Sequence, residues 1–305
     1  MTIARNLNWF QLAFQGKGSV LPIVVPRIVV FLGVSLLVAA LDYEQVLPEL
    51  PMFTAMADNV VCNLVLGLLL VFRTNTAYDR FWEGRKAWSD LVVTVRSLLR
   101  EMRTGLMKLD GIDGEERDRV FKYLAAFVVC VKLQLRSQDL EASKSDLKTL
   151  LDDSEIAKLK SVSSAPLELL LWVGNYIQKM CDRNVLDSNQ RYGMNCLLNH
   201  LVEGFTTCQR IQSTPIPSAY AVYLKWLTLL YCTLVPFSLV GTLHFATVFV
   251  TGFIAFILLS VEEIGNEIED PFGLDLNDLP LDEICDEIVV TIENAIVKRP
   301  YVTHR

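Results

Sequence analysis

The longest stretch without charge constrains this chain most. Between Trp226 and Val261 there are thirty-six consecutive residues without Asp, Glu, Lys or Arg. One helix of that length would be about 54 Å long, whereas crossing a bilayer core takes only ~20 apolar residues. Pro236 and Gly241 interrupt the run and predict a reversal there. The run therefore predicts a membrane hairpin, with one span near 218–236 and the other near 241–261.

Two further apolar runs lie in the first third of the chain. Residues 20–41 contain Arg27 as their only charge, which can reach the interface while the rest spans the membrane. Residues 60–72 are uncharged and continue without proline through a polar Arg-Thr-Asn-Thr run to Trp88, which predicts one helix about 43 Å long. Polar residues at membrane depth indicate that this second helix faces protein or water and not lipid.

Basic residues set the predicted orientation of these four spans. They gather before the first span and after the second, whereas residues 42–53 contain none. The positive-inside rule therefore places residues 42–53 outside and both termini in the cytosol. The N-terminus lacks the pattern of a cleaved secretory signal, so the first apolar run is expected to be a retained span.

The remaining sequence is polar enough for a large soluble region. The chain is 52% hydrophobic and 21% charged, which fits a membrane part joined to a soluble part. Apolar residues at helical spacing predict helices near 84–107, 114–136, 165–183, 187–212 and 281–297, and residues 5–15 form a short amphipathic pattern. We expect segments at 1–19 (N-terminal, interfacial or cytosolic), 20–84 (first two spans), 85–217 (cytosolic helices), 218–261 (last two spans) and 262–305 (acidic, cytosolic).

Charge is distributed unevenly. From Glu262 to Glu287 there are eleven acidic and no basic residues, so the rest of the chain carries −7 + 11 = +4. No nucleic-acid surface is indicated. The seven cysteines are scattered without metal-ligand spacing and read as buried thiols, not as disulfides or a zinc site.

No motif indicates an enzyme. The chain lacks a G-x-S-x-G elbow, a P-loop, a dinucleotide fingerprint and an H-E-x-x-H pair, and it has only three histidines. The classes that remain are a transport protein, a membrane scaffold and a membrane sensor.

Three segments carry a family resemblance. FRTNTAYDRFWEGRKAW (72–88), STPIPSAY (213–220) and EIEDPFGLDLNDLPLD (267–282) together resemble the bestrophin family, particularly its bacterial and plant chloroplast branch. The resemblance implies an all-α membrane protein, with four transmembrane helices and a large cytosolic helical region. It also implies a homopentameric ion channel with five subunits around one central pore and no required cofactor.

The resemblance changes how the second span is read. Leu64, Leu68 and Phe72 recur every four residues, a spacing that by itself is most typical of helix packing. In bestrophins the second membrane helix lines a hydrophobic neck with three apolar residues at this spacing, which favours these three as the pore neck. The family also implies a second constriction, the cytosolic aperture, which falls on Leu201, with Leu197 and Leu198 as neighbours that a small alignment shift would substitute.

The acidic segment raises the question of calcium. Glu267, Asp270, Asp275 and Asp278 match positions of the calcium-binding clasp of animal bestrophins, and carboxylates suit a hard cation. The spacing is not that of an EF-hand, and bacterial and plant relatives generally lack the clasp. A solvated acidic surface or a capping turn is the favoured alternative, so no metal site is assigned.

The leading functional hypothesis is a chloride-type anion channel, with bicarbonate as a second candidate ion. The Arg-Thr-Asn-Thr run after the neck favours anions, whereas Asp79 and Glu83 favour cations. The alternatives are a monovalent-cation channel and a non-conducting scaffold. The expected partners are identical subunits, membrane lipid and permeant inorganic ions. The expected location is the cytoplasmic membrane of a cell, with the thylakoid membrane as the alternative.

Overall fold

The computed structural model describes residues 18–46, 51–106, 109 and 112–297, and the described part contains helices and connecting turns but no strand. The predictions for residues 5–15 and for most of segment 1–19 concern residues outside these ranges. The elements are α2 (Leu21–Tyr43), α3 (Pro51–Ala57), α4 (Val60–Gly105), α5 (Ile112–Leu135), η2 (Leu140–Ser143), α6 (Lys144–Leu150), α7 (Asp153–Ser161), α8 (Ala165–Asp182), α9 (Ser188–Ser213), α10 (Ser218–Leu243), η3 (His244–Ala246), α11 (Thr247–Glu269) and α12 (Leu281–Val297).

The chain divides into two units. The first unit comprises the described residues up to Trp82, Thr214–Pro271 and Asp275–Asp278. The second unit comprises the described residues from Glu83 to Ser213, Phe272–Leu274 and those from Leu279 onward. The helix α4 begins in the first unit and ends in the second, because the boundary falls inside it.

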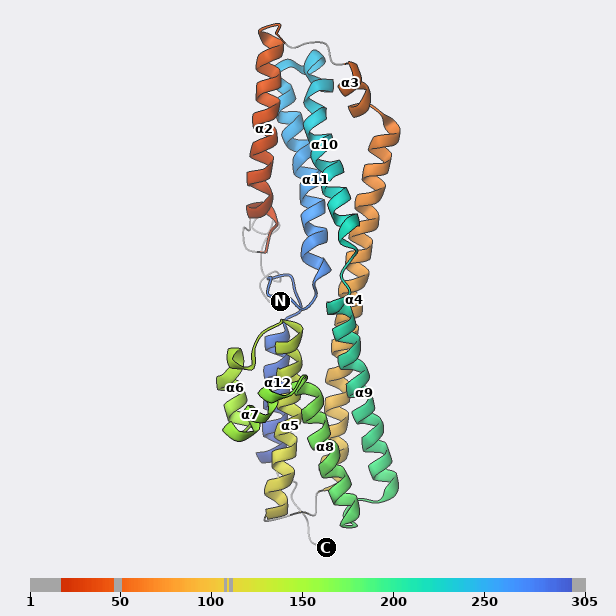
Figure 1. Cartoon of the computed structure of the whole chain (residues 1–305), viewed down its shortest axis with the longest axis vertical. Coiled ribbons are helices and arrows are strands. Elements are labelled where there is room, and N and C mark those ends of the chain that lie inside the picture. The colour runs from red at the N-terminus through yellow and green to blue at the C-terminus, as the bar shows by residue number, and fades with distance from the viewer. Residues whose placement is uncertain (1–17, 47–50, 107–108, 110–111, 298–305) are drawn as a thin grey trace. The chain divides into compact units, whose positions relative to one another are not determined.

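In the first unit α2 packs along α11 and α10 (Figure 1). Gly252 on α11 allows close approach, since a Cβ there would lie 2.6 Å from a methyl carbon of Leu32. The shared core contains residues from all three helices: Val24 and Phe31 of α2, Cys232 of α10, and Ala255 and Leu259 of α11. Three helical stretches of the described chain are long and apolar enough to cross a membrane: Leu21–Tyr43, Val60–Gly105 and Ser218–Glu269.

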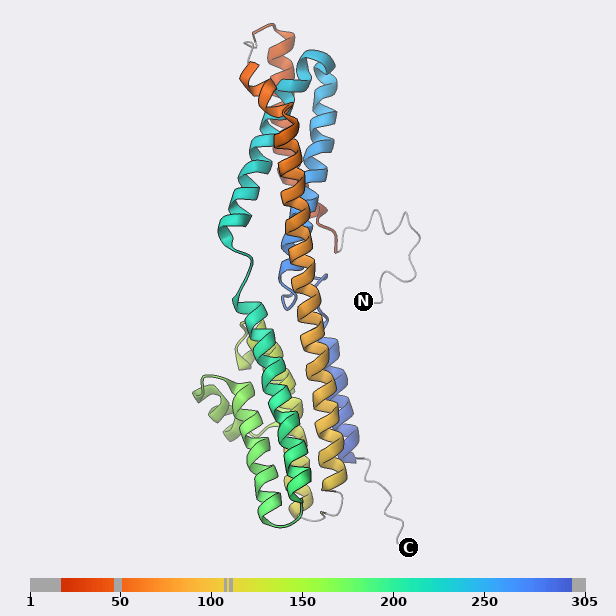
Figure 2. The ribbon, with the colours of Figure 1, turned by 90° about the vertical axis from the view of Figure 1, so that its right-hand side faces the viewer.

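The last of these stretches folds as a hairpin, but its turn is not where the sequence predicted it. Figure 2 shows the chain turning back from α10 into α11, and the two helices contact each other. Pro236 lies buried inside α10, which continues to Leu243. The reversal occurs at η3, where His244 adopts a positive φ of 47°. A proline removes one helical hydrogen bond but need not end an apolar helix that is packed against its neighbours, so the predicted reversal at Pro236 and Gly241 was wrong.

The helix α4 confirms the prediction of one unbroken helix through residues 60–88 and extends it to Gly105. Its first turn is capped by Asn59, whose Oδ1 accepts hydrogen bonds from the backbone N–H groups of Val61 (2.9 Å) and Cys62 (3.1 Å). This cap explains why the chain breaks between α3 and α4.

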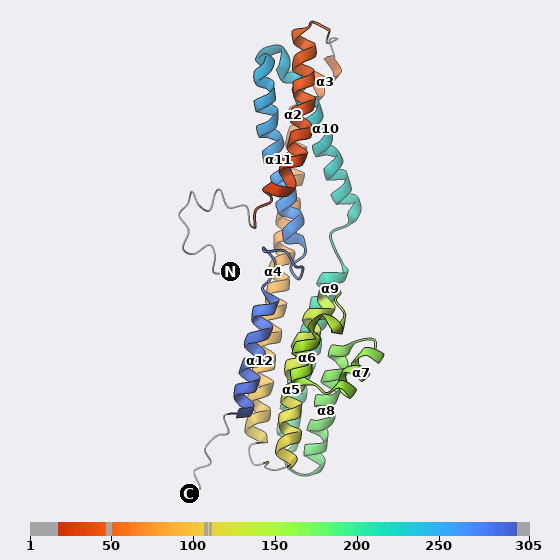
Figure 3. The ribbon, with the colours of Figure 1, turned by 90° about the vertical axis from the view of Figure 1, so that its left-hand side faces the viewer.

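In the second unit α5 packs on both α8 and α12 (Figure 3). The helices predicted near 114–136, 165–183, 187–212 and 281–297 are present as α5, α8, α9 and α12, and α12 has the predicted bounds. The helix predicted near 84–107 is the second half of α4 and not a separate element. The charged stretch 137–161 contains η2, α6 and α7, which bury Leu147, Leu150, Ile156 and Leu159. Trp88 of α4 is also buried.

Two features of the second unit bear on its chemistry. Asp282 bonds both Lys132 (2.8 Å) and Arg136 (2.7 Å). Burial opposes ionisation of this carboxyl, but the two cations outweigh it and lower the pKa of Asp282. All seven cysteines are free thiols, but the prediction that they are buried is wrong for Cys62, which is exposed. Burial raises the pKa of Cys130, Cys208 and Cys285 to about 12, which favours their protonated form.

Candidate pore helix and its polar network

The side chains predicted to form the neck lie on one exposed stripe of α4. Leu64, Leu68 and Phe72 are 60%, 46% and 59% exposed. Leu66 and Leu70, on another face of the same helix, are buried in a cluster with Leu224 of α10. The helix therefore uses one apolar face to pack within its own chain and leaves the other free.

An exposed apolar stripe of this kind can act as a barrier to ions when several copies surround an axis. Aliphatic and aromatic side chains offer no ligand to replace the hydration shell of an ion, so a narrow apolar ring blocks passage by dewetting. Small changes in its radius would then open or close the path.

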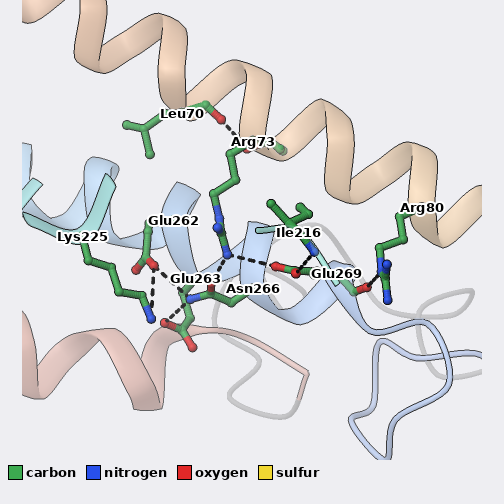
Figure 4. A network of polar contacts seen from close by, with 10 residues as sticks. Leu70, Arg73, Arg80, Ile216, Lys225, Glu262, Glu263, Asn266 and Glu269 are labelled. Carbon is green, nitrogen blue, oxygen red and sulfur yellow. Dashed lines mark hydrogen bonds and ion pairs between the residues drawn. The ribbon is translucent and has the colours of Figure 1, made fainter. Parts of the chain in front are cut away.

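Arg73 does not lie on this stripe. Although it follows Phe72 directly, it is only 2% exposed and points toward α11 (Figure 4). Its Nη2 lies 3.2 Å from Oε2 of Glu269 and also donates to Oδ1 of Asn266. Because this charge is paired inside the subunit, Arg73 does not supply the anion preference expected of the Arg-Thr-Asn-Thr run.

A polar network continues from Arg73 through the first unit (Figure 4). The other carboxylate oxygen of Glu269 accepts a hydrogen bond from the backbone N–H of Ile216 (3.0 Å). Arg80, about two turns after Arg73 on α4, donates its Nε–H to the backbone carbonyl of Glu269 (2.6 Å). These contacts fasten α4 to the end of α11 and to the short segment before α10.

The buried carboxylates of α11 complete this network. Glu263 lies 2.6 Å from Arg27 of α2, and Glu262 lies 3.9 Å from Lys225 of α10. Asn266 donates its Nδ2–H groups to Glu262 (3.0 Å) and to Glu263 (3.3 Å). Sequence reasoning missed these pairs. The only signal was an unusual one: two consecutive glutamates directly after a thirty-six-residue uncharged run.

The structure does not support Leu201 as the residue that lines the cytosolic aperture. Leu201 is fully buried in the second unit, and Leu198, one of its two alternatives, is also buried. A side chain with no exposed surface in its own subunit is unable to line a pore. Leu197, the other alternative, is half-buried, and the exposed apolar side chain next to Leu201 is Val202, at 38%. The family resemblance identified the helix, α9, but not which of its faces is exposed.

The four carboxylates considered for calcium are not gathered into one site. Glu267 accepts a hydrogen bond from Asn277 (2.7 Å), and Asp278 accepts one from the backbone N–H of Asp275 (2.7 Å), as in a capping turn. Asp270 follows the end of α11. Among the described residues, no group of three or more His, Cys, Asp or Glu is placed to hold a metal ion.

Comparisons with known proteins agree with these features. Residues 1–294 match the family model described as bacterial/fungal bestrophin protein. A voltage-dependent anion channel-forming protein of Nostoc sp. is 42% identical over 302 residues, covering 99% of this chain and 96% of that protein. A protein of the same description from Synechocystis sp. is 41% identical over 296 residues, covering 96% of this chain and 93% of its own length.

A solved structure matches the fold as well. The crystal structure of a bacterial bestrophin homologue from Klebsiella pneumoniae aligns with a TM-score of 0.79 and 30% identity, covering 91% of this chain and 100% of that chain. The names of the relatives describe channel-forming proteins and no enzymatic activity. With a family model over nearly its whole length and two relatives above 40% identity, the chain belongs to the bestrophin family, in its bacterial and fungal branch.

Proposed function

We propose that the chain forms a homopentameric anion channel with four membrane-spanning helices per subunit, α2, α4, α10 and α11, and both termini in the cytosol. The single observation that carries the proposal is the exposed apolar stripe of Leu64, Leu68 and Phe72 on an unbroken helix. The names of the relatives support anions as the permeant class, with chloride first and bicarbonate second. We place this channel in the cytoplasmic membrane of a cell, with the thylakoid membrane as the alternative.

In this channel the three side chains form the neck. Each of five copies of α4 contributes one stripe, so the pore is closed by three stacked apolar rings. The network around Arg73 and Glu269 sets the position of α4 within each subunit. A second constriction on α9 involves Val202 in place of Leu201. The acidic residues 267–278 serve to cap and connect α11, and calcium at this segment is not part of the proposal.

Planar-bilayer recording of neck variants tests the proposal. Leu68→Ala and Phe72→Ala each remove part of an apolar ring, so we expect the current at a given voltage to rise severalfold. Leu37→Ala makes the same truncation at an exposed position of α2 and is expected to leave the current unchanged. Wild-type current in both neck variants would refute the neck, and no ion flux from liposomes holding the wild type would favour a scaffold.

Two observations keep the cation channel as a second candidate. Arg73 no longer supports anion preference, and Asp79 is exposed on α4 below the neck. Reversal potentials in asymmetric KCl separate the two candidates, because a chloride channel and a potassium channel reverse at potentials of opposite sign.

A further inference from the structure

The exposed stripe of α4 continues beyond the neck. Within the first unit, exposed residues follow one another at intervals of three or four along a single face, and this face contains Val61, Leu64, Leu68, Phe72, Asn75, Asp79 and Trp82. This mean spacing of 3.5 residues keeps all seven side chains on one side of a straight helix. The residues that line the neck and the residues below it are therefore parts of one surface.

Asp79 is the charged residue of this stripe between Val61 and Trp82. It lies seven residues after Phe72, which is about 10 Å along the helix axis. Within the described part of the chain its carboxylate has no hydrogen bond or ion pair, whereas Glu83, four residues later, is bonded to Arg210 at 2.7 Å. Asp79 thus keeps its charge unneutralised on the surface that carries the neck.

Arg73 and Arg80, the two arginines of α4 between Phe72 and Trp82, do not cancel this charge on the stripe. Arg73 is buried and paired with Glu269. Arg80 is directed away from the stripe, because its guanidinium donates to the backbone carbonyls of Glu269 and Thr214. The polar network that holds α4 in place therefore turns both cations inward and leaves the anion outward.

We propose that Asp79 is a selectivity-determining residue, whose five copies form a ring of negative charge just below the neck and hold down the preference of the channel for anions. This inference rests on the proposed pore function and deepens it. A ring of like charges beside a low-dielectric constriction attracts cations and repels anions within about one Debye length, roughly 8 Å at physiological salt. The direction of the effect is the same whether the wild type prefers anions or cations.

Reversal potentials of the purified channel in asymmetric KCl test the inference. Asp79→Asn removes the ring without changing side-chain size, and we expect the chloride-to-potassium permeability ratio to rise by about threefold or more. Asp79→Glu keeps the charge and should retain the wild-type ratio. Glu283→Gln removes one exposed carboxylate per chain from α12 and should also retain it.

Ionic strength gives a second readout that a merely structural effect would not show. The Debye length falls to about 3 Å at 1 M salt, so the difference between Asp79→Asn and wild type should shrink there. A conducting channel whose permeability ratio is the same in wild type and Asp79→Asn at low salt would overturn the role of Asp79 and leave the pore intact. Absence of conduction in the wild type would overturn both.

Discussion

At the scale of single residues, Arg73 is the clearest case of a charge with a structural role. Breaking a buried pair by removing one partner typically costs about 3–5 kcal/mol, because the other charge is left buried. Glu269, whose side chain is 18% exposed, would be that partner. We therefore expect Arg73→Ala to lower the apparent Tm of the purified protein strongly, as measured by thermal unfolding in detergent.

An exposed pair supplies the control for Arg73. Arg96 and Glu287 lie 2.6 Å apart, but their side chains are 45% and 67% exposed. Exposed pairs contribute about 0–1 kcal/mol, so Arg96→Ala should change the apparent Tm little. Equal losses in the two variants would show that the Arg73–Glu269 contact is not a buried stabilising pair.

These residues also show what a sequence reveals about a site. The four-residue spacing of Leu64, Leu68 and Phe72 placed them correctly on one face, because a long helix has a fixed repeat. Spacing did not reveal that Arg73 turns inward or that Leu201 is buried. Both facts depend on which neighbouring helix covers each face, and that is decided by packing between distant segments.

At the scale of secondary-structure elements, the contact between α4 and α9 depends on a glycine. A Cβ at Gly204 would lie 2.9 Å from Cγ of Leu91, which is too close for an unstrained contact. A Cβ at Gly193, on the same helix, would meet nothing within 4 Å. The two glycines of α9 thus have the same propensity cost but different surroundings.

This difference predicts opposite effects of the same substitution. Gly193→Ala should stabilise by about 0.5–1 kcal/mol through helix propensity. Gly204→Ala gains the same helix-propensity stabilisation but forces the side chain of Leu91 to move, which typically costs about 1–3 kcal/mol. This variant should therefore lower the apparent Tm. The close approach of α9 to α4 would be disproved if both variants melted above the wild type.

The helices were more predictable from the sequence than the turns between them. The helix α12 has the expected bounds, and α4 is unbroken as expected, because neither contains proline and both repeat at helical spacing. The turn before α11 was misplaced because Pro236 is tolerated in α10, whereas His244, which has no breaker signature, adopts the positive φ. Local sequence thus marks helices well and turns poorly where packing supports a proline.

At the scale of the whole chain, the acidic block after the last apolar helix supplies counter-charges. Its first part neutralises basic residues of the first unit, through Glu263 with Arg27 and Glu269 with Arg73. Its later part does the same in the second unit, where Asp282 bonds Lys132. The block is therefore not a free acidic tail, although the rest of the chain, at +4, offsets only part of its −11.

The number of subunits decides whether the exposed stripes can enclose a path for ions. One chain offers one exposed stripe, and a closed pore needs several copies of α4 arranged by rotational symmetry. With five copies of a 34.4 kDa chain, native mass spectrometry from detergent should give a particle of 5 × 34.4 = 172 kDa. Phe72→Ala, which alters the neck, should keep this mass because the stripe faces the axis. A wild-type particle of one or two chains would contradict the central pore, since two copies of α4 are unable to enclose a path for ions.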